Sequence, residues 1–340
     1  MPASHDSAKV TFIHVTLRDN ASILEKSIRL LRRDNQDSSH IVVCPRRDVA
    51  YLASVLEPIG PDILVRDETE IYAIGDLMED LESAISGSPV PIKSTNPEGW
   101  FYQQILKLLL IVELATDLGP RNVVMLDADT CLIRKKFPFF LADGTSISYA
   151  TLNESHGAYY RSSMSLIGGD RDPIAYRSRR RYISSTCQIA SLSASESAAF
   201  ARFLALRAGG DPADLSSRQG KRAIVRLILR EAMRHPTLDS EGHYMSPISE
   251  QDIIGYFKYH YFNAQQVPLK YFRGKEIPNP TDLQVGVLKR LGYHHYSSES
   301  WDRESRFAHH WWFFLPIVLA DSIRQDFKRL RYWFRVGRHP

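Results

Sequence analysis

The stretch that most constrains this chain is residues 122–133, which read NVVMLDADTCLI. Four apolar residues end abruptly at Asp127 and Asp129, a pattern typical of a buried strand in a parallel sheet. Ligands bind beyond the carboxyl ends of such strands. Two carboxylates in that place can share one hard cation, so we predict a Mg²⁺ or Mn²⁺ site at Asp127 and Asp129. A plain turn is the structural alternative, because Asp is common after strands.

Strand and helix patterns alternate before this stretch. Apolar strand patterns cover residues 10–15, 40–44 and 63–65, and helical periodicity covers residues 21–33 and 48–56. The alternation predicts an α/β fold with a parallel sheet and helices on its faces. The chain has 340 residues, of which 44% are hydrophobic, so it is long enough to build one large domain of this kind.

Three polar residues follow the early strands. In a parallel sheet Thr16, Arg18 and Arg66 would lie at the same edge as Asp127. A nucleotide could bind there, with Thr16 toward the base and an arginine toward phosphate. The alternative is that both arginines are solvated and pair with neighbouring acidic residues.

A helix that begins near residue 97 carries a polar stripe. Trp100, Gln103, Gln104, Lys107 and Ile111 share one face by their spacing, beside an apolar face. Burying amides and an amine requires partners, so the stripe either faces a ligand or lies on a solvated flank.

The stretches GWFYQQILKLLL (99–110) and MLDAD (125–129) together resemble a bacterial glycosyltransferase-like family, DUF6492. Ser249-Glu250 resembles a later element of that family, which often has an aromatic residue where this chain has Gln251. The resemblance implies a GT-A-like, Rossmann-related α/β fold with a mixed, mainly parallel sheet and flanking helices. It also implies a UDP- or GDP-sugar donor used with Mn²⁺ or Mg²⁺. It also directs Gln103, Gln104 and Lys107 toward the donor or acceptor, and leaves Asp127 facing either the metal or the ribose.

Ser249 opens another predicted helix, with Glu250 and Asp252 in its first turn. Ser249 is a plausible N-cap, and the acidic residues complement the helix dipole, which is a complete structural explanation. The functional alternative makes Glu250 or Asp252 a general base, or an anchor for the acceptor hydroxyl. The resemblance favours Glu250.

The third metal ligand is expected late in the chain. His294 and His295 follow a glycine turn, and a neutral imidazole such as that of His295 could complete the site with Asp127 and Asp129. His309-His310 is the rival pair. A strand predicted over residues 182–189 adds Ser185 and Gln188 as candidates near the sugar, again through the resemblance.

The tail carries the basic charge of the chain. Residues 321–340 hold six Lys or Arg against two Asp, which accounts for the net charge of +4 and argues against a broad nucleic-acid-binding surface. The preceding run WWFFLPIVLA is too short to span a bilayer, which takes about 20 residues. We predict a domain over residues 1–308 and an amphipathic helical tail over 309–340. The tail either contacts an anionic membrane or packs on the domain.

Three scattered cysteines and a polar N-terminus favour a cytoplasmic protein, with peripheral contact at the inner membrane. The leading hypothesis is metal-dependent sugar transfer from a nucleotide-sugar to a glycan or lipid-linked acceptor in cell-surface polysaccharide or glycolipid synthesis. A nucleotidyltransferase of similar fold and a non-catalytic membrane scaffold are the alternatives.

Overall fold

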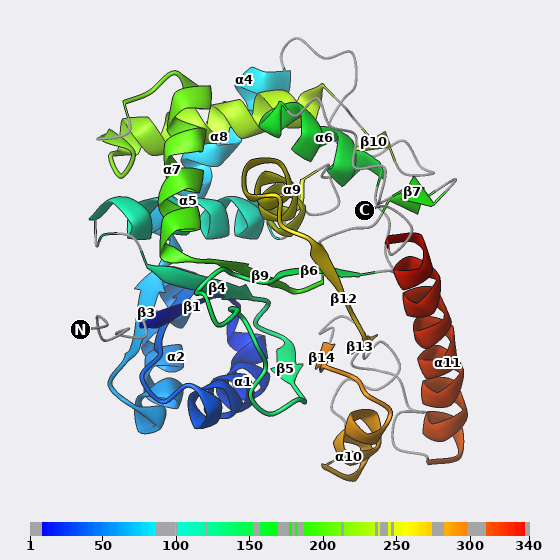
Figure 1. Ribbon diagram of the computed structural model, residues 1–340. Helices are drawn as coiled ribbons and strands as arrows, with labels where there is room; N and C mark the ends of the chain where they lie inside the picture. Colours follow the sequence, from blue (N-terminus) through cyan, green and yellow to red (C-terminus); the bar gives the residue numbers. More distant parts are fainter. Residues whose placement is uncertain are drawn as a thin grey trace, which may run out of the picture.

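The computed structural model describes residues 9–85, 99, 101–117, 119, 121–151, 157–168, 177–178, 181–182, 187–211, 214–234, 237–238, 244–245, 248–273, 282–297 and 311–336. Within these residues a five-stranded sheet of order β3-β2-β1-β4-β9 forms the centre (Figure 1). Its strands are β1 (Val10–Val15), β2 (Ser39–Cys44), β3 (Ile63–Asp67), β4 (Asn122–Leu126) and β9 (Ile189–Leu192). Strands β1 to β4 are parallel and β9 pairs antiparallel with β4, so the predicted mixed, mainly parallel sheet is confirmed.

Helices cover both faces of this sheet (Figure 1). One face carries α1 (Ala21–Asp34) and α2 (Val49–Leu56), while the other carries α5 (Tyr102–Asp117) with further helices above it. The remaining helices are α3 (Glu68–Ile71), α4 (Ile74–Ile85), α6 (Gly157–Ile167), α7 (Ala194–Ala208), α8 (Arg218–Met233), α9 (Glu250–Phe262), α10 (Asp282–Arg290) and α11 (Trp311–Val336).

Alternation along β1 divides the core in two. Ile13 and Val15 belong to the cluster that contains the apolar residues of α5, while Phe12 packs with Val124 and Leu126 on the other side. Helix α5 is buried on almost all sides, because it lies between the sheet and the helices α7 and α9. Polar residues on α5 therefore need internal partners.

A second, three-stranded sheet extends from the first. It has the order β13-β14-β5 and consists of β13 (Tyr271–Arg273), β14 (His295–Ser297) and β5 (Thr130–Leu132). Strand β5 follows the Asp127–Asp129 turn directly, so its antiparallel pairing with β14 brings the late chain to that turn. The other short strands are β6 (Ser148–Thr151), β7 (Arg177–Ser178), β8 (Arg181–Tyr182), β10 (Thr237–Leu238), β11 (Tyr244–Met245) and β12 (Gln266–Leu269).

The strand predicted over residues 182–189 is wrong in its bounds. Tyr182 ends β8 and Ile189 begins β9, which are separate elements, and residues 183–186 lie outside the described part of the chain. Before β9, Gln188 has a φ of +65°, which lies in the left-handed region and outside the extended conformation of a regular strand. The helical tail is present as α11, and the predicted boundary at residue 308 stays a prediction.

Two stacked histidines lie inside the parallel sheet. The His14 Nε2 and His40 Nδ1 atoms are 3.3 Å apart, and both side chains are fully buried. Burial lowers the pKa of His14 to about 3 and that of His40 to about 2, so both rings are neutral near pH 7.

We expect the free energy of unfolding to fall as the pH falls below about 6.5, because the unfolded chain then takes up protons that the folded chain does not. Each histidine contributes fully to the free energy of unfolding above the pKa of about 6.5 that it has in the unfolded chain, and the contribution is lost as the pH falls toward its pKa in the folded chain. The loss amounts to about 2 kcal/mol per histidine between pH 7.5 and pH 5. Urea unfolding at both pH values measures it. A double variant, His14→Gln with His40→Gln, should lose less stability on acidification than wild type; an equal loss contradicts the assignment.

Candidate functional site

The site lies where the parallel strands β1 and β4 end. These strands pair with Ile13 opposite Met125, so the residues that follow them, Thr16 and Asp127, come to the same edge of the sheet. Asp127 donates its backbone N–H to the Gln188 carbonyl at 3.1 Å, which attaches the turn to the start of β9. The sequence pattern of an apolar run closed by acids therefore marks this edge correctly.

Lys107 reaches this edge from the middle of α5. Its Nζ lies 2.5 Å from Asp127 Oδ1 and 2.8 Å from Glu250 Oε1. Lys107 and Glu250 are both almost fully buried, whereas the Asp127 side chain is 30% exposed. One ammonium thus joins the helix α5, the acidic turn after β4 and the first residue of α9.

Two glutamines complete the contacts around the ammonium. Gln104 Oε1 accepts the backbone N–H of Glu250 at 3.1 Å. Gln251 Nε2 donates to Asp127 Oδ2 at 3.3 Å, and its Oε1 accepts the backbone N–H of Gln188 at 2.8 Å. The polar stripe predicted on α5 is buried through Gln104 and Lys107, which find their partners on α9 and on the acidic turn.

The charges in this cluster do not balance within it, since one ammonium faces two carboxylates. Burial alone would lower the pKa of Lys107, but Asp127 and Glu250 outweigh it and raise that pKa, so the ammonium stays charged. Burial raises the pKa of Glu250, against the attraction of Lys107 and with the added repulsion of Asp127. The cluster can therefore accept further positive charge at Asp127, its exposed member.

Asp129 is held from the late part of the chain. Ser297 on β14 donates its hydroxyl to Asp129 Oδ2 at 3.1 Å. Two residues earlier on the same strand, His295 places its Nε2 at 3.1 Å from the Gln188 side-chain oxygen, and its ring stacks on Tyr271 with 5.1 Å between ring centroids. Residues two apart lie on one face of a strand, so the same face of β14 contacts both Asp129 and Gln188.

The described residues contain no group of three or more His, Cys, Asp and Glu side chains that could hold a metal ion, so His295 does not join Asp127 and Asp129 in such a group. His295 is fully buried, burial lowers its pKa to about 3, and its Nε2 is engaged with Gln188. His294 is tied to the Lys270 backbone, and His309-His310 lies outside the described residues. The two partly exposed carboxylates still have the hard oxygen donors that Mg²⁺ and Mn²⁺ prefer.

Thr16, Arg18 and Arg66, which were predicted to bind the nucleotide, each contact different partners. Thr16 is buried and bonds to the Leu17 carbonyl, while the Arg18 guanidinium lies 4.2 Å from the centre of the Tyr51 ring. Arg66 pairs with Glu113 Oε1 at 2.5 Å, and Lys221 takes the other oxygen of Glu113. Arg66 of β3 and Lys221 of α8 therefore form an ion-pair network around Glu113 of α5.

Gln103 is half-buried on α5, beside Gln104. Trp100 has no described side chain, and Ser185 lies outside the described residues. The binding roles predicted for Gln103, Arg18 and Thr16 stay predictions.

The predicted cap of α9 is confirmed, because Ser249 Oγ accepts the backbone N–H of Asp252 at 3.3 Å. Glu250 also reaches Lys107, so the structural and the functional interpretation of this turn apply together. Asp252 is buried, and its predicted catalytic role stays a prediction.

Sequence reasoning missed Gln251 and Ser297. Gln251 directly follows Glu250 in the first turn of α9, where a long amide side chain can reach the same edge as its neighbour. Ser297 follows His295 by two residues, which places both on one face of β14. These spacings were visible in the sequence, but the pairing of β14 with β5 was not.

Comparison with solved structures finds sugar transferases at low similarity. The galactosyltransferase LgtC, in complex with donor and acceptor sugar analogues, is 12% identical, with 93% of this chain and 96% of that chain covered and a TM-score of 0.44. Mouse xyloside xylosyltransferase 1 in its apo form is 11% identical, with 86% and 98% covered and a TM-score of 0.37. The bifunctional glycosyltransferase WbbM is 11% identical, with 98% of this chain and 53% of that one covered and a TM-score of 0.42.

No curated protein sequence matches this chain. A family model does match, over residues 15–198, which is more than half of the chain. That range contains the end of β1, α5, the acidic turn after β4 and Gln188, and the predicted family is confirmed. The chain belongs to DUF6492, described as a family of unknown function.

Proposed function

We propose that this protein transfers a sugar from a nucleotide-sugar, a UDP- or GDP-sugar, to a hydroxyl of a glycan or lipid-linked acceptor. The observation that carries the proposal is the buried Lys107 ammonium, held between Asp127 and Glu250 at the carboxyl edge of the sheet. Lys107 holds Asp127 in place at a ligand-binding edge, where the acidic turn can bind the cation that accompanies a leaving nucleoside diphosphate.

The acidic turn has the groups to receive the diphosphate and its counterion. Asp127 and Asp129 would hold Mn²⁺ or Mg²⁺, which supplies positive charge to the leaving diphosphate when bound. The chain fixes both carboxylates beforehand: Lys107 and Gln251 each take one oxygen of Asp127, and Ser297 takes one oxygen of Asp129. Such preorganised groups need little rearrangement during the reaction.

Asp127 is also open enough to accept a hydrogen bond from a ribose hydroxyl, because its side chain is 30% exposed.

We assign Gln188 to orienting the sugar. Its backbone is fixed in a left-handed conformation by Gln251 and Asp127, and its side-chain oxygen lies beside His295. The low pKa of His295 keeps its ring neutral, so a ring N–H can donate to that oxygen and leave the Gln188 amide group to donate to a hydroxyl. His295 is thus a positioning residue in this proposal.

Glu250 acts through Lys107 rather than on the acceptor. Its side chain is 1% exposed, and its carboxylate contacts the ammonium at 2.8 Å. The predicted role of Glu250 or Asp252 as a general base requires an acceptor hydroxyl to reach a carboxyl that is closed to solvent in this structure. We therefore assign Glu250 to holding the Lys107 charge in place.

The acceptor and the cellular setting are part of the same proposal. A lipid-linked acceptor in polysaccharide or glycolipid synthesis would be presented at the cytoplasmic face of a membrane. The basic tail and the three buried free cysteines agree with that setting.

The first test is nucleotide-sugar binding in the presence of Mn²⁺. We expect a UDP- or GDP-sugar to raise the melting temperature of the protein only when Mn²⁺ is present. Asp129→Asn should remove that shift and lower donor hydrolysis by at least about 100-fold, because one hard oxygen ligand is replaced by an amide.

Asp37→Asn is the matched control, since Asp37 is exposed on the loop after α1, and it should behave as wild type. The transferase proposal is wrong if no nucleotide-sugar shifts the melting temperature, with or without Mn²⁺, and no hydrolysis is detected. Incorporation of a nucleoside monophosphate into product would point instead to nucleotidyl transfer.

A second prediction concerns the charge at the centre of the site. Lys107→Met should destabilise the protein by about 3–5 kcal/mol, because it leaves the buried Glu250 beside Asp127 without a cation. Adding Glu250→Gln to Lys107→Met should restore a large part of that stability, since the uncompensated buried carboxyl is gone. Urea unfolding of the single and double variants measures the difference, and equal stabilities would show that Glu250 does not depend on Lys107.

A further inference from the structure

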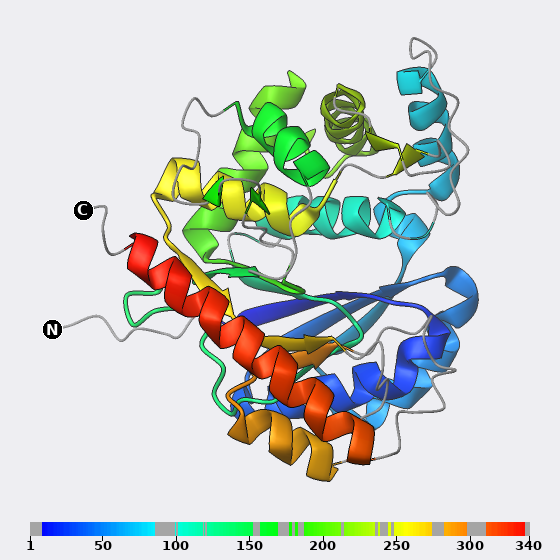
Figure 2. The same cartoon turned by 90° about the vertical axis from the view of Figure 1, so that its right-hand side faces the viewer.

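The outer helix α11 has an unusual orientation. It lies along the outside of the molecule, past the three-stranded sheet and α10 (Figure 2). Between residues 315 and 333, where the structure describes the side chains of α11, the buried ones are Val318, Ser322, Gln325 and Tyr332, and of these only Val318 has no polar atom. An amphipathic helix of a globular protein normally buries its apolar face.

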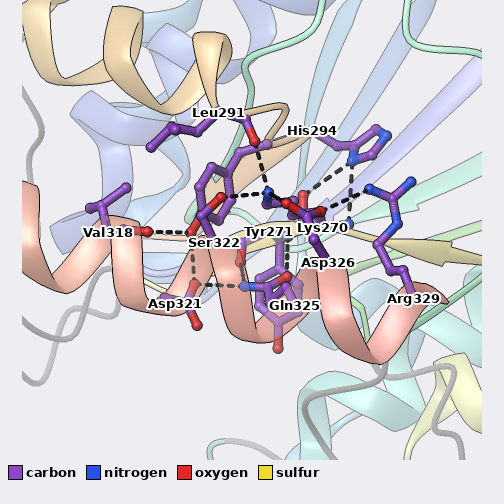
Figure 3. Close-up of polar contacts among 11 residues, drawn as sticks. Lys270, Tyr271, Leu291, His294, Val318, Asp321, Ser322, Gln325, Asp326 and Arg329 are labelled. Carbon is purple, nitrogen blue, oxygen red and sulfur yellow. Dashed lines mark hydrogen bonds and ion pairs between the residues drawn. The ribbon is translucent and has the colours of Figure 1, made fainter. Parts of the chain in front are cut away.

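Polar contacts attach α11 to the body (Figure 3). The buried Lys270 extends its Nζ to Ser322 Oγ at 2.7 Å and to Asp326 Oδ2 at 2.6 Å, and also donates to the Leu291 carbonyl. Lys270 directly precedes β13, so its ammonium holds α11 against the edge of the three-stranded sheet. Because a buried ammonium needs these acceptors, this orientation of α11 is strongly favoured.

Gln325 fixes the same orientation by a second set of bonds (Figure 3). Its side chain accepts the backbone N–H of Tyr271 at 3.2 Å and donates to the Tyr271 carbonyl at 2.8 Å, as a neighbouring strand would. The Tyr293 hydroxyl donates to Asp321 at 2.9 Å. Rotating the helix to bury its apolar face would break every one of these bonds.

The apolar face of α11 is consequently left in solvent. We call Leu315, Leu319, Ile323, Phe327 and Leu330 the apolar stripe, because their spacing places them on one side of the helix. Ile323 is 70% exposed, Phe327 55% and Leu330 56%, against 3% for Gln325 on the attached face. A contiguous exposed apolar patch of this kind is typical of a binding surface.

The charges beside the apolar stripe indicate what covers it. Arg324, Lys328 and Arg331 follow one another at helical spacing on the adjacent side, and the Arg331 guanidinium lies 4.4 Å from the centre of the Phe327 ring. Both acidic residues of α11 are engaged in polar contacts: Asp326 binds Lys270, and Asp321 binds Tyr293 and Arg324. The side of α11 next to the apolar stripe is therefore basic, while Asp326, whose side chain is 51% exposed, lies toward the attached side with Lys270.

We propose that the apolar stripe of α11 is a docking surface for an anionic lipid membrane. Apolar side chains would enter the boundary between headgroups and acyl chains, while the adjacent basic residues meet lipid phosphates. A second copy of this chain is a poorer occupant, because the two basic rows would repel each other. None of the helices in the described residues has the length and apolar character to cross a membrane.

This inference deepens the membrane part of the proposed function, because a docked α11 would hold the site near a lipid-linked acceptor. Vesicle binding needs no sugar transfer, however, so the two proposals fail separately. Deleting the tail is a poor test, since it would also remove the partners of the buried Lys270. Substitutions confined to the outward side chains leave those contacts intact.

The experiment measures co-sedimentation of the full chain with vesicles of phosphatidylcholine, with and without about 30% phosphatidylglycerol. We expect wild type to bind the anionic vesicles at least about tenfold more tightly than the neutral ones. The triple variant Ile323→Gln, Phe327→Gln, Leu330→Gln should lose at least about tenfold of that binding, because three membrane-entering side chains become polar. Lys328→Gln with Arg331→Gln should weaken binding and reduce its dependence on salt.

The matched control removes three similarly exposed apolar side chains elsewhere, by Leu64→Gln, Leu141→Gln and Leu206→Gln, and should bind as wild type. Melting temperatures and the nucleotide-sugar shift should stay unchanged in the α11 variants, which separates loss of docking from loss of fold or site. The proposal is overturned if the triple variant still binds anionic vesicles like wild type. It is also overturned if wild type does not co-sediment with anionic vesicles and instead forms a dimer that the triple variant abolishes.

Discussion

The contact on which the site depends is the ammonium of Lys107 between two carboxylates. Lys107 belongs to helix α5, which is buried on nearly all sides, and an unpaired charge there would be strongly unfavourable. That penalty ties three separate parts of the chain together: the middle of α5, the acidic turn after β4 and the start of α9. A charge fixed in this way has a defined position before any ligand arrives, which is the property that electrostatic catalysis requires.

The second constraint is the return of the late chain to the acidic turn. Strand β14 pairs with β5 and contacts the turn directly through Ser297 on Asp129, while His295 contacts Gln188, whose carbonyl binds the backbone of Asp127. The ring of His295 in turn stacks on Tyr271, whose backbone is bound by Gln325 of α11. A series of contacts through Tyr271, His295 and Gln188 therefore joins α11 to the site.

The inner helix α5 buries polar side chains, whereas the outer helix α11 exposes apolar ones. Helix α5 carries polar side chains into the core because each has a partner there, and α11 presents apolar side chains to solvent because its polar face is used for attachment. A buried lysine makes the central contacts in both cases: Lys107 of α5 binds Asp127 and Glu250, and Lys270, opposite α11, binds Ser322 and Asp326. Amphipathicity alone would have predicted the opposite orientation for α11.

Local patterns in the sequence were enough to predict the parallel strands, the acidic turn at their carboxyl ends, the cap of α9 and the family. These features depend on periodicity, on capping residues and on short motifs, all of which are readable within a few turns of chain. Long-range packing alone established that Lys107 bridges Asp127 and Glu250, that Gln251 and Ser297 belong to the site, and that His295 binds Gln188 instead of joining the aspartates. Those outcomes depend on contacts between residues more than 100 positions apart, for which no local pattern carries information.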